Sequence, residues 1–312
     1  MLNISYNVSP KLNDSLSKIE DLRKQILLTP IPPAVELRLR WEATFNRTYA
    51  SLNLSGSSID KNEVLRILSE IRPGKMNKNQ HLVLGFKKAN DFIAQNWLGA
   101  AKTINAHDLI EIYGMIDGGK LRVPEAGLQY LLDYLQAKSE NPIIQAGIVG
   151  IEMEKMQLFS ENNKLISLLT SNLFLYRYGY DFRGFLAYEK EWTGNNGTYK
   201  DNHERALSAA SLTLWLEYFA ESILKQLEII NQFFKAPPTA TLDLKESYWK
   251  LNERQKSLLN FLSQPQATIT NRQVQKRYNI SQITASRDLV RLTNLGYLLS
   301  HGKGRSVYYT KI

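Results

Sequence analysis

Apolar residues recur with the spacing of an α-helix along most of the first 234 residues of this chain. Side chains three or four positions apart share one face of a helix, so this pattern predicts helices that each bury one face. The segments with the clearest pattern are 62–71, 81–97, 106–116, 125–135, 142–156, 165–176 and 206–234. We therefore expect a helical N-terminal domain over residues 1–234, with a loop at the Gly-Asn-Asn-Gly sequence of residues 194–197.

The helical pattern stops after Phe234. Pro237 and Pro238 follow, and two prolines exclude a continuing helix. We therefore take residues 235–252 as a linker and expect a second, smaller domain over residues 253–312.

The second domain mixes short helical and short alternating segments. Thr270 and Gln273 have the spacing of a capping box, which marks the start of a helix, and Ser281 is a good N-cap for the next one. The predicted elements are a helix over 254–263, a strand over 267–269, helices from 271 and over 282–295, and strands over 297–300 and 306–309. This order predicts a winged helix, so the fold class is mainly α with a short β wing.

The helix over 282–295 has two distinct faces. Ala285, Leu289 and Leu292 fall on one side and predict a buried stripe. Polar and basic side chains lie on the other side or beside its N-terminus: Gln282, Thr284, Ser286, Arg287 and Arg291.

Charge separates the two domains further. The 312 residues have a net charge of +9, and the ten basic and two acidic residues from Glu253 onward account for +8 of it. Residues 1–252 are left with +1. A basic module joined to a nearly neutral domain is typical of proteins that bind a polyanion.

Composition excludes several kinds of chemistry. The chain has no cysteine, which rules out disulfides, thiolate zinc sites and a cysteine nucleophile. The N-terminus does not read as a signal peptide, and no apolar stretch approaches the roughly 20 residues that span a bilayer. We expect a cytoplasmic protein without a membrane segment, without a bound metal and without a cofactor.

Residues 280–298, ISQITASRDLVRLTNLGYL, resemble the recognition helix and following strand of bacterial DeoR-like regulators. The resemblance implies that this helix enters the major groove of double-stranded DNA while the wing rests on the backbone. The residues that would face base edges are Gln282, Thr284, Ser286 and Arg287, and those that would meet phosphates are Arg291, Lys303 and Arg305. The alternative is a winged helix used for packing or for contact with another protein.

Residues 142–180 resemble the central helix–loop–helix of the Fic (filamentation induced by cAMP) family, and the resemblance extends over about 35–234. That family moves AMP, or a related phosphate-containing group, from a nucleotide to a protein hydroxyl, and its loop reads H-P-F-x-[DE]-G-N-G-R-x-x-R. Phe159, Glu161 and Asn163 match this motif. The positions that depart from it are Gln157 for the histidine, Leu158 for the proline, Asn162 and Lys164 for the glycines, and Leu165 and Leu168 for the arginines.

Each departure removes a part of the family's chemistry. A glutamine amide cannot take a proton from a hydroxyl as the histidine does. Glycines let backbone N–H groups wrap closely around a phosphate, and arginines bind its oxygens in a forked geometry that leucine cannot supply. Glu161 keeps the place of the metal-binding acid, but without a phosphate partner a metal would bind there weakly. We predict that Gln157, Phe159, Glu161 and Asn163 now support the fold.

Two flanking features are reduced as well. Many Fic proteins carry an inhibitory [ST]-x-x-x-E-[GN] helix start, and the corresponding segment here has Gly56 for the hydroxyl residue and Asp60 for the glutamate. Asp60 is equally well explained as a helix N-cap. The hairpin that aligns the target peptide in active relatives is reduced to residues 118–124.

These observations favour a Fic-like pseudoenzyme that binds DNA, in which the helical domain serves as a sensor, a dimerisation surface or a scaffold for a protein partner. The first alternative is an AMP-transferring enzyme (AMPylator) of the Fic family with an atypical motif, which would use ATP with magnesium. The second is an interaction module with neither activity.

Overall fold

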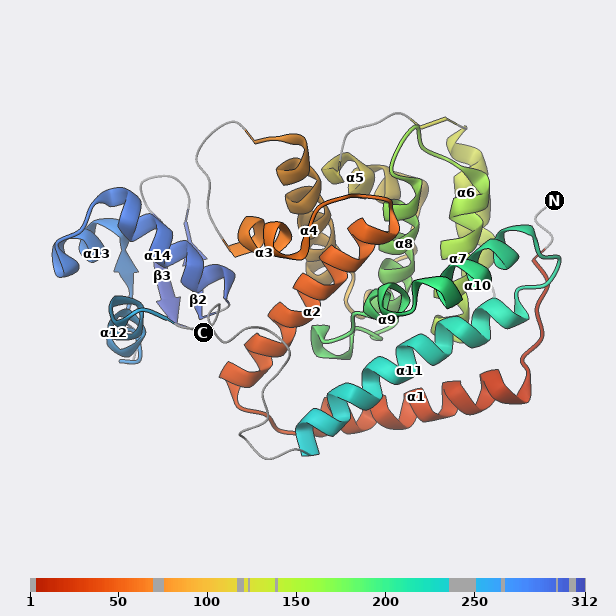
Figure 1. Cartoon of the computed structure of the whole chain (residues 1–312), viewed down its shortest axis with the longest axis horizontal. Helices are drawn as coiled ribbons and strands as arrows, with labels where there is room; N and C mark the ends of the chain where they lie inside the picture. The colour runs from red at the N-terminus through yellow and green to blue at the C-terminus, as the bar shows by residue number, and fades with distance from the viewer. Residues whose placement is uncertain are drawn as a thin grey trace.

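The computed structural model of the chain describes residues 4–69, 76–116, 121–122, 124–137, 140–235, 251–264, 267–295, 297–302 and 307–311. Within these residues a large helical body is followed by a small C-terminal module that carries a three-stranded sheet (Figure 1). The expected mainly α architecture with a short β wing is therefore confirmed.

The described part of the body is built from helices joined by short connections. Their bounds are α1 Pro10–Leu28, α2 Pro33–Leu54, α3 Lys61–Ser69, α4 Lys78–Trp97, α5 Ala106–Ile116, α6 Glu125–Gln136, α7 Pro142–Met156, α8 Asn163–Arg177, the 3₁₀ helix η1 Phe182–Gly184, α9 Glu189–Gly194, α10 Asn196–Ser208 and α11 Thr213–Lys235.

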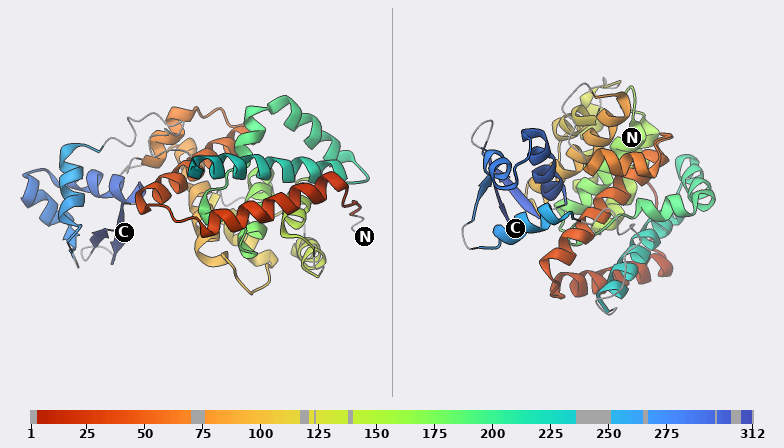
Figure 2. Two further views of the ribbon diagram at one scale, coloured as in Figure 1. Left: turned by 90° about the horizontal axis from the view of Figure 1, so that it is seen from below. Right: turned by 60° about the vertical axis from the view of Figure 1, so that its left-hand side comes forward.

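The pair α7 and α8 forms the centre of the body, and α2, α4, α5, α6, α10 and α11 pack around it (Figures 1 and 2). Every residue of α8 from Leu165 to Tyr176 is buried. A helix that is buried on all sides lies in the middle of a core rather than on its surface.

Small residues let the neighbours of α7 approach closely. A Cβ atom at Gly150 would lie 2.5 Å from the Ser171 hydroxyl oxygen of α8, and one at Gly147 would lie 2.8 Å from Leu216 of α11. Ser171 uses this approach to donate a hydrogen bond of 2.9 Å to the backbone oxygen of Ala146. The two glycines therefore set the spacing of the central layer.

Helices α1 and α11 lie side by side along one edge of the body and run in the same direction (Figure 1). The Ser9 hydroxyl, which caps α1, donates a hydrogen bond of 2.6 Å to Glu217 near the start of α11. Asn231 donates to the Gln25 side chain at 3.1 Å near the other ends of both helices.

The expectation for residues 194–234 was wrong in two places. Helices α9 and α10 meet with Asn195 alone between them, because the stacked rings of Trp192 and Tyr199, 5.1 Å apart, are buried across the expected loop. The helix expected over 206–234 is broken between Ser208 and Thr213, where the Leu212 N–H donates to the Ser5 backbone oxygen at 2.8 Å. Tertiary contacts override local preference at both sites.

The C-terminal module consists of α12 Glu253–Phe261, β1 Ile269–Thr270, α13 Asn271–Tyr278, α14 Gln282–Asn294, β2 Leu298–His301 and β3 Tyr308–Lys311. The strands are antiparallel in the order β1-β3-β2, with Ile269 opposite Tyr309 and Ser300 opposite Tyr309 on the other side. The predicted capping box of Thr270 and Gln273 is present, and Ser281 caps α14 as expected. Ala285, Leu289 and Leu292 form the predicted stripe in the core of the module.

The module also touches the body. Leu295, which follows α14, is buried in the hydrophobic core of the body, and α14 packs against α3. The next described residue, Tyr297, lies near Arg38 of α2, whose charge opposes the rise in its pKa that burial causes. Among the described helices, none combines the length and the apolarity needed to cross a membrane.

The crossing of α4 over α5 supplies a test of this packing. A Cβ atom at Gly85 would lie 2.5 Å from the Met115 backbone oxygen, whereas one at Gly114 of α5 would meet no atom within 4 Å. We expect Gly85→Ala to lower the free energy of unfolding by about 1–3 kcal/mol, because the two helices must separate. Gly114→Ala, the matched control, should raise it by about 0.5–1 kcal/mol, because alanine favours a helix.

Urea unfolding of both variants and of the unaltered protein measures these changes in the free energy of unfolding. Equal stability of Gly85→Ala and Gly114→Ala would contradict the close crossing of α4 and α5.

Candidate functional site

The connection between α7 and α8 is a tight turn of residues 157–162. Gln157 at its start and Asn162 at its end both have left-handed backbone conformations, with φ of 47° and 56°. Asparagine tolerates this region well, and glutamine adopts it as the residue that ends α7. The turn therefore keeps a sharp backbone path without the glycines that the Fic motif would place there.

Asn163 holds this turn together. Its Oδ1 accepts a hydrogen bond of 2.9 Å from the Phe159 N–H, and its Nδ2 donates one of 2.8 Å to the Phe159 backbone oxygen. The Phe159 ring is buried against Tyr113 of α5, with ring centroids 4.0 Å apart, and the Tyr113 hydroxyl donates to the Glu161 backbone oxygen at 3.1 Å.

The short connection between α5 and α6 lies on the same turn. Leu121 pairs with Phe159 in an antiparallel bridge, and the Arg122 N–H donates to the Leu158 backbone oxygen at 2.7 Å. The Arg122 side chain also donates to the Ser160 backbone oxygen at 3.0 Å. The described residues of this reduced hairpin are thus bonded to the loop itself; residues 118–120 and 123 lie outside the described part.

A mostly buried cluster of titratable side chains lies next to the turn, each of them 11–15% exposed. The Glu154 carboxylate of α7 contacts Lys164 Nζ at 2.7 Å and His203 Nε2 at 2.9 Å. Lys164 Nζ is also 2.8 Å from His203 Nε2, and the Ser167 hydroxyl donates to Glu154 at 3.1 Å. Aromatic rings enclose the cluster, since Tyr199 stacks on His203 with centroids 5.2 Å apart.

The pKa values in this cluster reflect burial and mutual charge. Burial alone would raise the pKa of Glu154, but the hydrogen bond to His203 and the charge of Lys164 outweigh it, so the pKa is lowered. Burial lowers the pKa of Lys164, and the adjacent carboxylate offsets part of this effect. The carboxylate is therefore held ionised in a site that excludes most water.

The expected burial of the leucines in this region is confirmed. Leu165 and Leu168, which stand where the Fic motif has arginines, are 0% and 3% exposed, and Ile166 and Leu169 are equally buried. Lys164, which stands where a glycine would be, puts its ammonium group in contact with Glu154. In the described structure, apolar packing and a satisfied ion pair occupy the region where the resemblance places a phosphate.

The predicted motif residues are not gathered around one cavity. Gln157 is exposed, and its amide donates to the Glu154 backbone oxygen at 2.6 Å. Glu161 is exposed as well, and no group of three or more His, Cys, Asp or Glu side chains in the described residues could hold a metal. Asp60 caps α3, accepting hydrogen bonds from the Asn62 and Glu63 N–H groups at 2.8 and 3.0 Å.

His203 was missed by sequence reasoning. It lies 49 positions after Glu154, on α10, and it lacks the Pro-Phe neighbours that mark a motif histidine. A long-range contact of this kind leaves no spacing signal in one sequence.

In the C-terminal module, the first turn of α14 is presented to solvent. Gln282 and Arg287 are exposed, as expected of residues that reach a partner. Thr284 and Ser286 are half-buried and bonded within the module, Thr284 to the Ser281 hydroxyl at 2.9 Å and Ser286 to Asn271 at 2.8 Å.

Arg291 is half-buried farther along α14. Lys303 and Arg305, predicted to contact phosphates, lie outside the described residues.

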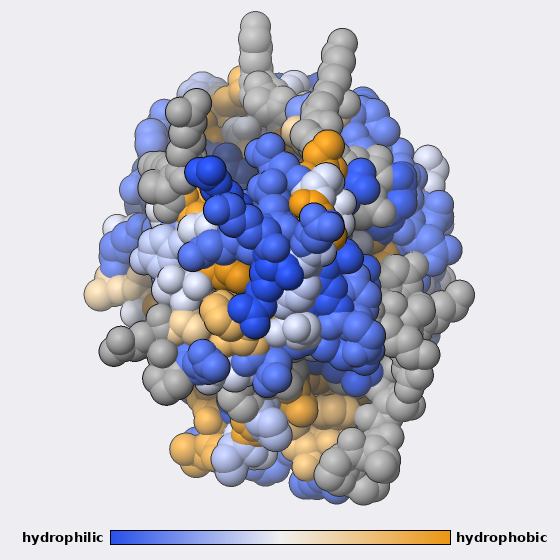
Figure 3. All heavy atoms as spheres, turned by 90° about the vertical axis from the view of Figure 1, so that its left-hand side faces the viewer, coloured by the Kyte–Doolittle hydropathy of each residue, from blue (hydrophilic) through white to orange (hydrophobic). Residues whose placement is uncertain are grey.

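Three more basic side chains are exposed on the preceding helix, α13. Arg272, Lys276 and Arg277 of α13 are exposed, and Arg277 lies over the Phe261 ring at 4.2 Å. Both acids of the module are occupied, since Asp288 bonds Arg254 and Gln255 and Glu253 bonds Lys256. The middle of the face that carries the module is mostly hydrophilic (Figure 3).

Ile283, an apolar residue, was not among the side chains predicted to contact DNA. It is 60% exposed in the first turn of α14, between Gln282 and Thr284. An exposed isoleucine beside arginines can contact the methyl group of thymine in a major groove.

Comparison with solved structures identifies the fold. The whole chain superposes on 98% of a Fic family protein from Desulfovibrio desulfuricans G20, with a TM-score of 0.62 and 14% identity. Fic-1 from C. elegans matches with a TM-score of 0.57 and 19% identity over 73% of each chain. A Fic domain containing signaling protein from Bacteroides thetaiotaomicron VPI-5482 matches with a TM-score of 0.56 and 15% identity, over 74% of this chain and 99% of that one.

These likenesses define the class of protein by its fold: the helical body is Fic-like, as the resemblance of residues 142–180 implied. No protein-family model matches the sequence. A comparison with curated proteins finds no significant match.

The Glu154 cluster supplies a test of what holds the α7–α8 turn. Glu154→Gln leaves the Lys164 ammonium buried without its carboxylate, so we expect the free energy of unfolding to fall by about 3–5 kcal/mol. Glu221→Gln is the control, because Glu221 likewise contacts two basic side chains, Lys11 and Lys225 at 3.1 Å each, but is 34% exposed. That change should cost less than about 1 kcal/mol.

Urea unfolding at several pH values measures both effects. Because the pKa of Glu154 is lowered in the folded state, its contribution is present above the ordinary carboxyl pKa of about 4.3 and is lost as the pH falls through the folded value. An equal fall in the free energy of unfolding for Glu154→Gln and Glu221→Gln at neutral pH would contradict the role of Glu154 in holding the turn.

Proposed function

We propose that this protein is a DNA-binding regulatory protein whose Fic-like body has lost the chemistry of AMP transfer. The observation that carries the proposal is the first turn of α14. The side chains of Gln282 and Ile283 in that turn and of Arg287 in the next turn are exposed, and exposed basic residues of α13 lie on the neighbouring helix. Phosphates attract such a surface, and base edges can be read from the end of one helix.

The contacts divide into two kinds. Arg287 and Gln282 are able to form forked hydrogen bonds with guanine and adenine, and Ile283 to contact a thymine methyl group. The remaining positive charges of α13, α14 and the wing would meet phosphates, namely Arg272, Lys276, Arg277, Arg291, Lys303 and Arg305. Because Thr284 and Ser286 are engaged within the module, we assign them a smaller part in base recognition.

The sequence of the body supports the second part of the proposal, the loss of AMP transfer. A base, a phosphate cradle and a clamp for the phosphate oxygens are all needed for AMP transfer, and Gln157, Lys164 and Leu168 stand in their places. The alternative, an AMPylator that uses ATP with magnesium, would need another base and an open pocket. We infer a cytoplasmic regulator in which the body acts as a sensor or as the surface for a second copy or a protein partner.

DNA binding is tested with the full chain in a mobility-shift titration. Arg287→Ala should weaken binding to a selected duplex by about tenfold and relax preference at one base position. Arg205→Ala is the control. It removes the same charge from an exposed position on α10 of the body and should leave DNA binding unchanged. Affinity should fall steeply with salt, because phosphate contacts release counterions.

No shift of random or selected duplexes at low salt would contradict DNA binding. Equal effects of Arg287→Ala and Arg205→Ala would contradict the assignment of α14.

AMP transfer is tested with radiolabelled ATP, magnesium and a cell lysate. We expect neither self-modification nor labelling of lysate proteins, because Gln157 replaces the motif's base and Leu165 and Leu168 replace its phosphate-binding arginines. ATP with magnesium should also leave the melting temperature unchanged, since a ligand stabilises only a state that it binds. Labelling that the unaltered protein supports and Gln157→Ala abolishes would establish the enzyme alternative.

A further inference from the structure

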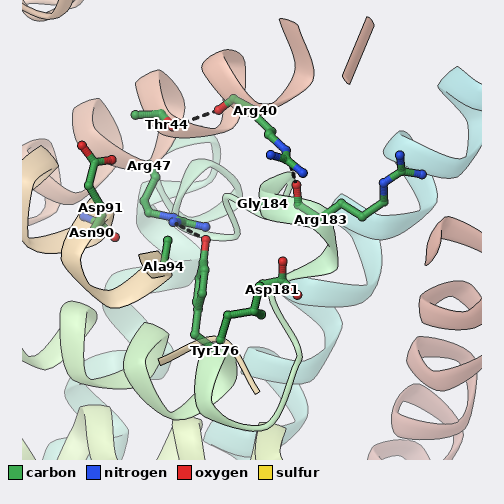
Figure 4. A pocket seen from close by; sticks show the side chains of 11 residues that line it. Arg40, Thr44, Arg47, Asn90, Asp91, Ala94, Tyr176, Asp181, Arg183 and Gly184 are labelled. Carbon is green, nitrogen blue, oxygen red and sulfur yellow. Dashed lines mark hydrogen bonds between the residues drawn. The ribbon is translucent and has the colours of Figure 1, made fainter. Parts of the chain in front are cut away.

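A pocket of about 230 Å³ lies in the body between α2, α4 and the segment that follows α8 (Figure 4). Its lining carries charges of both signs, and several of them are already paired. Glu36 bonds Arg40 and Arg183, and Lys87 bonds Asp91. Such a lining selects neither an anion nor a cation. The polar contacts that bear most directly on function lie instead in the C-terminal module.

Asn271, the first residue of α13, connects that helix with α14. Its Nδ2 donates to the Ser286 hydroxyl at 2.8 Å and to the Gln282 backbone oxygen at 3.3 Å. A backbone carbonyl can only accept, so these contacts fix which end of the amide faces α14. Gln275, one turn farther along α13, donates to Asn271 Oδ1. The half-buried amide of Asn271 is therefore held by partners on both helices.

Asp288 holds the other flank of α14. The residue is 4% exposed, and its carboxylate accepts hydrogen bonds from Gln255, at 2.8 Å, and from Arg254, both on α12. Because a helix turns by about 100° per residue, Ser286 and Asp288 project about 100° to either side of Arg287. Arg287 is exposed between these two flanks.

The rotation of α14 about its own axis decides where the Arg287 side chain points. A group about 6 Å from the axis moves by about 1.6 Å when the helix rotates by about 15°. That is more than a hydrogen bond to a base edge tolerates. Apolar contacts are not directional, so the hydrogen bonds on the two flanks restrict this rotation more closely than the core does.

We propose that Asn271 is a positioning residue for base recognition, which sets the rotation of α14 through Ser286 and Gln282 and thereby the base that Arg287 reaches. The inference rests on the proposed binding of DNA. It gives Ser286 a part that depends on Asn271, in place of a direct contact with a base. Arg287 touches the DNA, and Asn271 acts through α14.

The test uses the full chain and duplexes selected from a randomised pool. Arg287→Ala first identifies the base position whose preference it relaxes. Asn271→Ala should reduce the preference at that same position from about tenfold to about threefold, because Arg287 is kept but less well placed. Binding to a random duplex, and its dependence on salt, should stay unchanged because the phosphate contacts are kept.

Ser286→Ala, alone and combined with Asn271→Ala, shows whether the two residues act as one unit. Alone it should relax the same base position, and in the Asn271→Ala background it should have no further effect. Asn260→Ala is the matched control, since it makes the same substitution at an exposed position of α12. It should keep the preference of the unaltered protein, and all of the variants should melt cooperatively.

An unchanged preference in Asn271→Ala would overturn the proposal, and so would an equal loss of affinity for every duplex. A further loss on adding Ser286→Ala would also overturn it, because Ser286 would then contact a base itself. Absence of DNA binding by the unaltered protein would contradict the proposed function as well. The two proposals are therefore distinguished by whether the unaltered protein binds.

Discussion

The arrangement of this protein depends on how one buried carboxylate is neutralised. Glu154 lies near the end of the central helix α7, and its side chain is only 11% exposed between α8 and α10. An ionised carboxylate in such a place must be paired, and Lys164 from α8 and His203 from α10 provide the pairing. The Glu154 carboxylate thereby connects three helices, α7, α8 and α10. The turn between α7 and α8, the position of α10 and the burial of Leu165 and Leu168 all follow from it.

The same contact lies at the loop that resembles the Fic motif but departs from it in sequence. In that motif, glycines and arginines would surround a phosphate, which is a ligand that supplies negative charge. Here Glu154 is the negative charge, and the lysine that replaces a glycine is its partner. The hydrogen bonds of Asn163 to Phe159 and the bridge to Leu121 then keep the loop closed. The fold retains its path through this region with a different set of interactions.

Much of the fold could be predicted from the sequence because it is encoded locally. The apolar spacing located α3 to α8, and the capping residues Thr270 and Ser281 located the starts of α13 and α14. The rest is decided by contacts between distant segments. Nothing near His203 in the sequence indicates its contact with Glu154. The break before α11 likewise depends on Ser5, about two hundred positions earlier.

The burial of Leu295 in the body gives α14 a fixed end and a free end. Ile283, in the exposed turn, lies twelve residues from Leu295, or about 18 Å along the helix axis. A tilt of about 5° around Leu295 would therefore displace Ile283 by about 1.6 Å, which is more than a hydrogen bond tolerates. A small rotation of α14 about Leu295 thus produces a larger displacement at its exposed end. The contacts of α14 with α3 and of Leu295 with the body core therefore set the direction in which the exposed turn of α14 points.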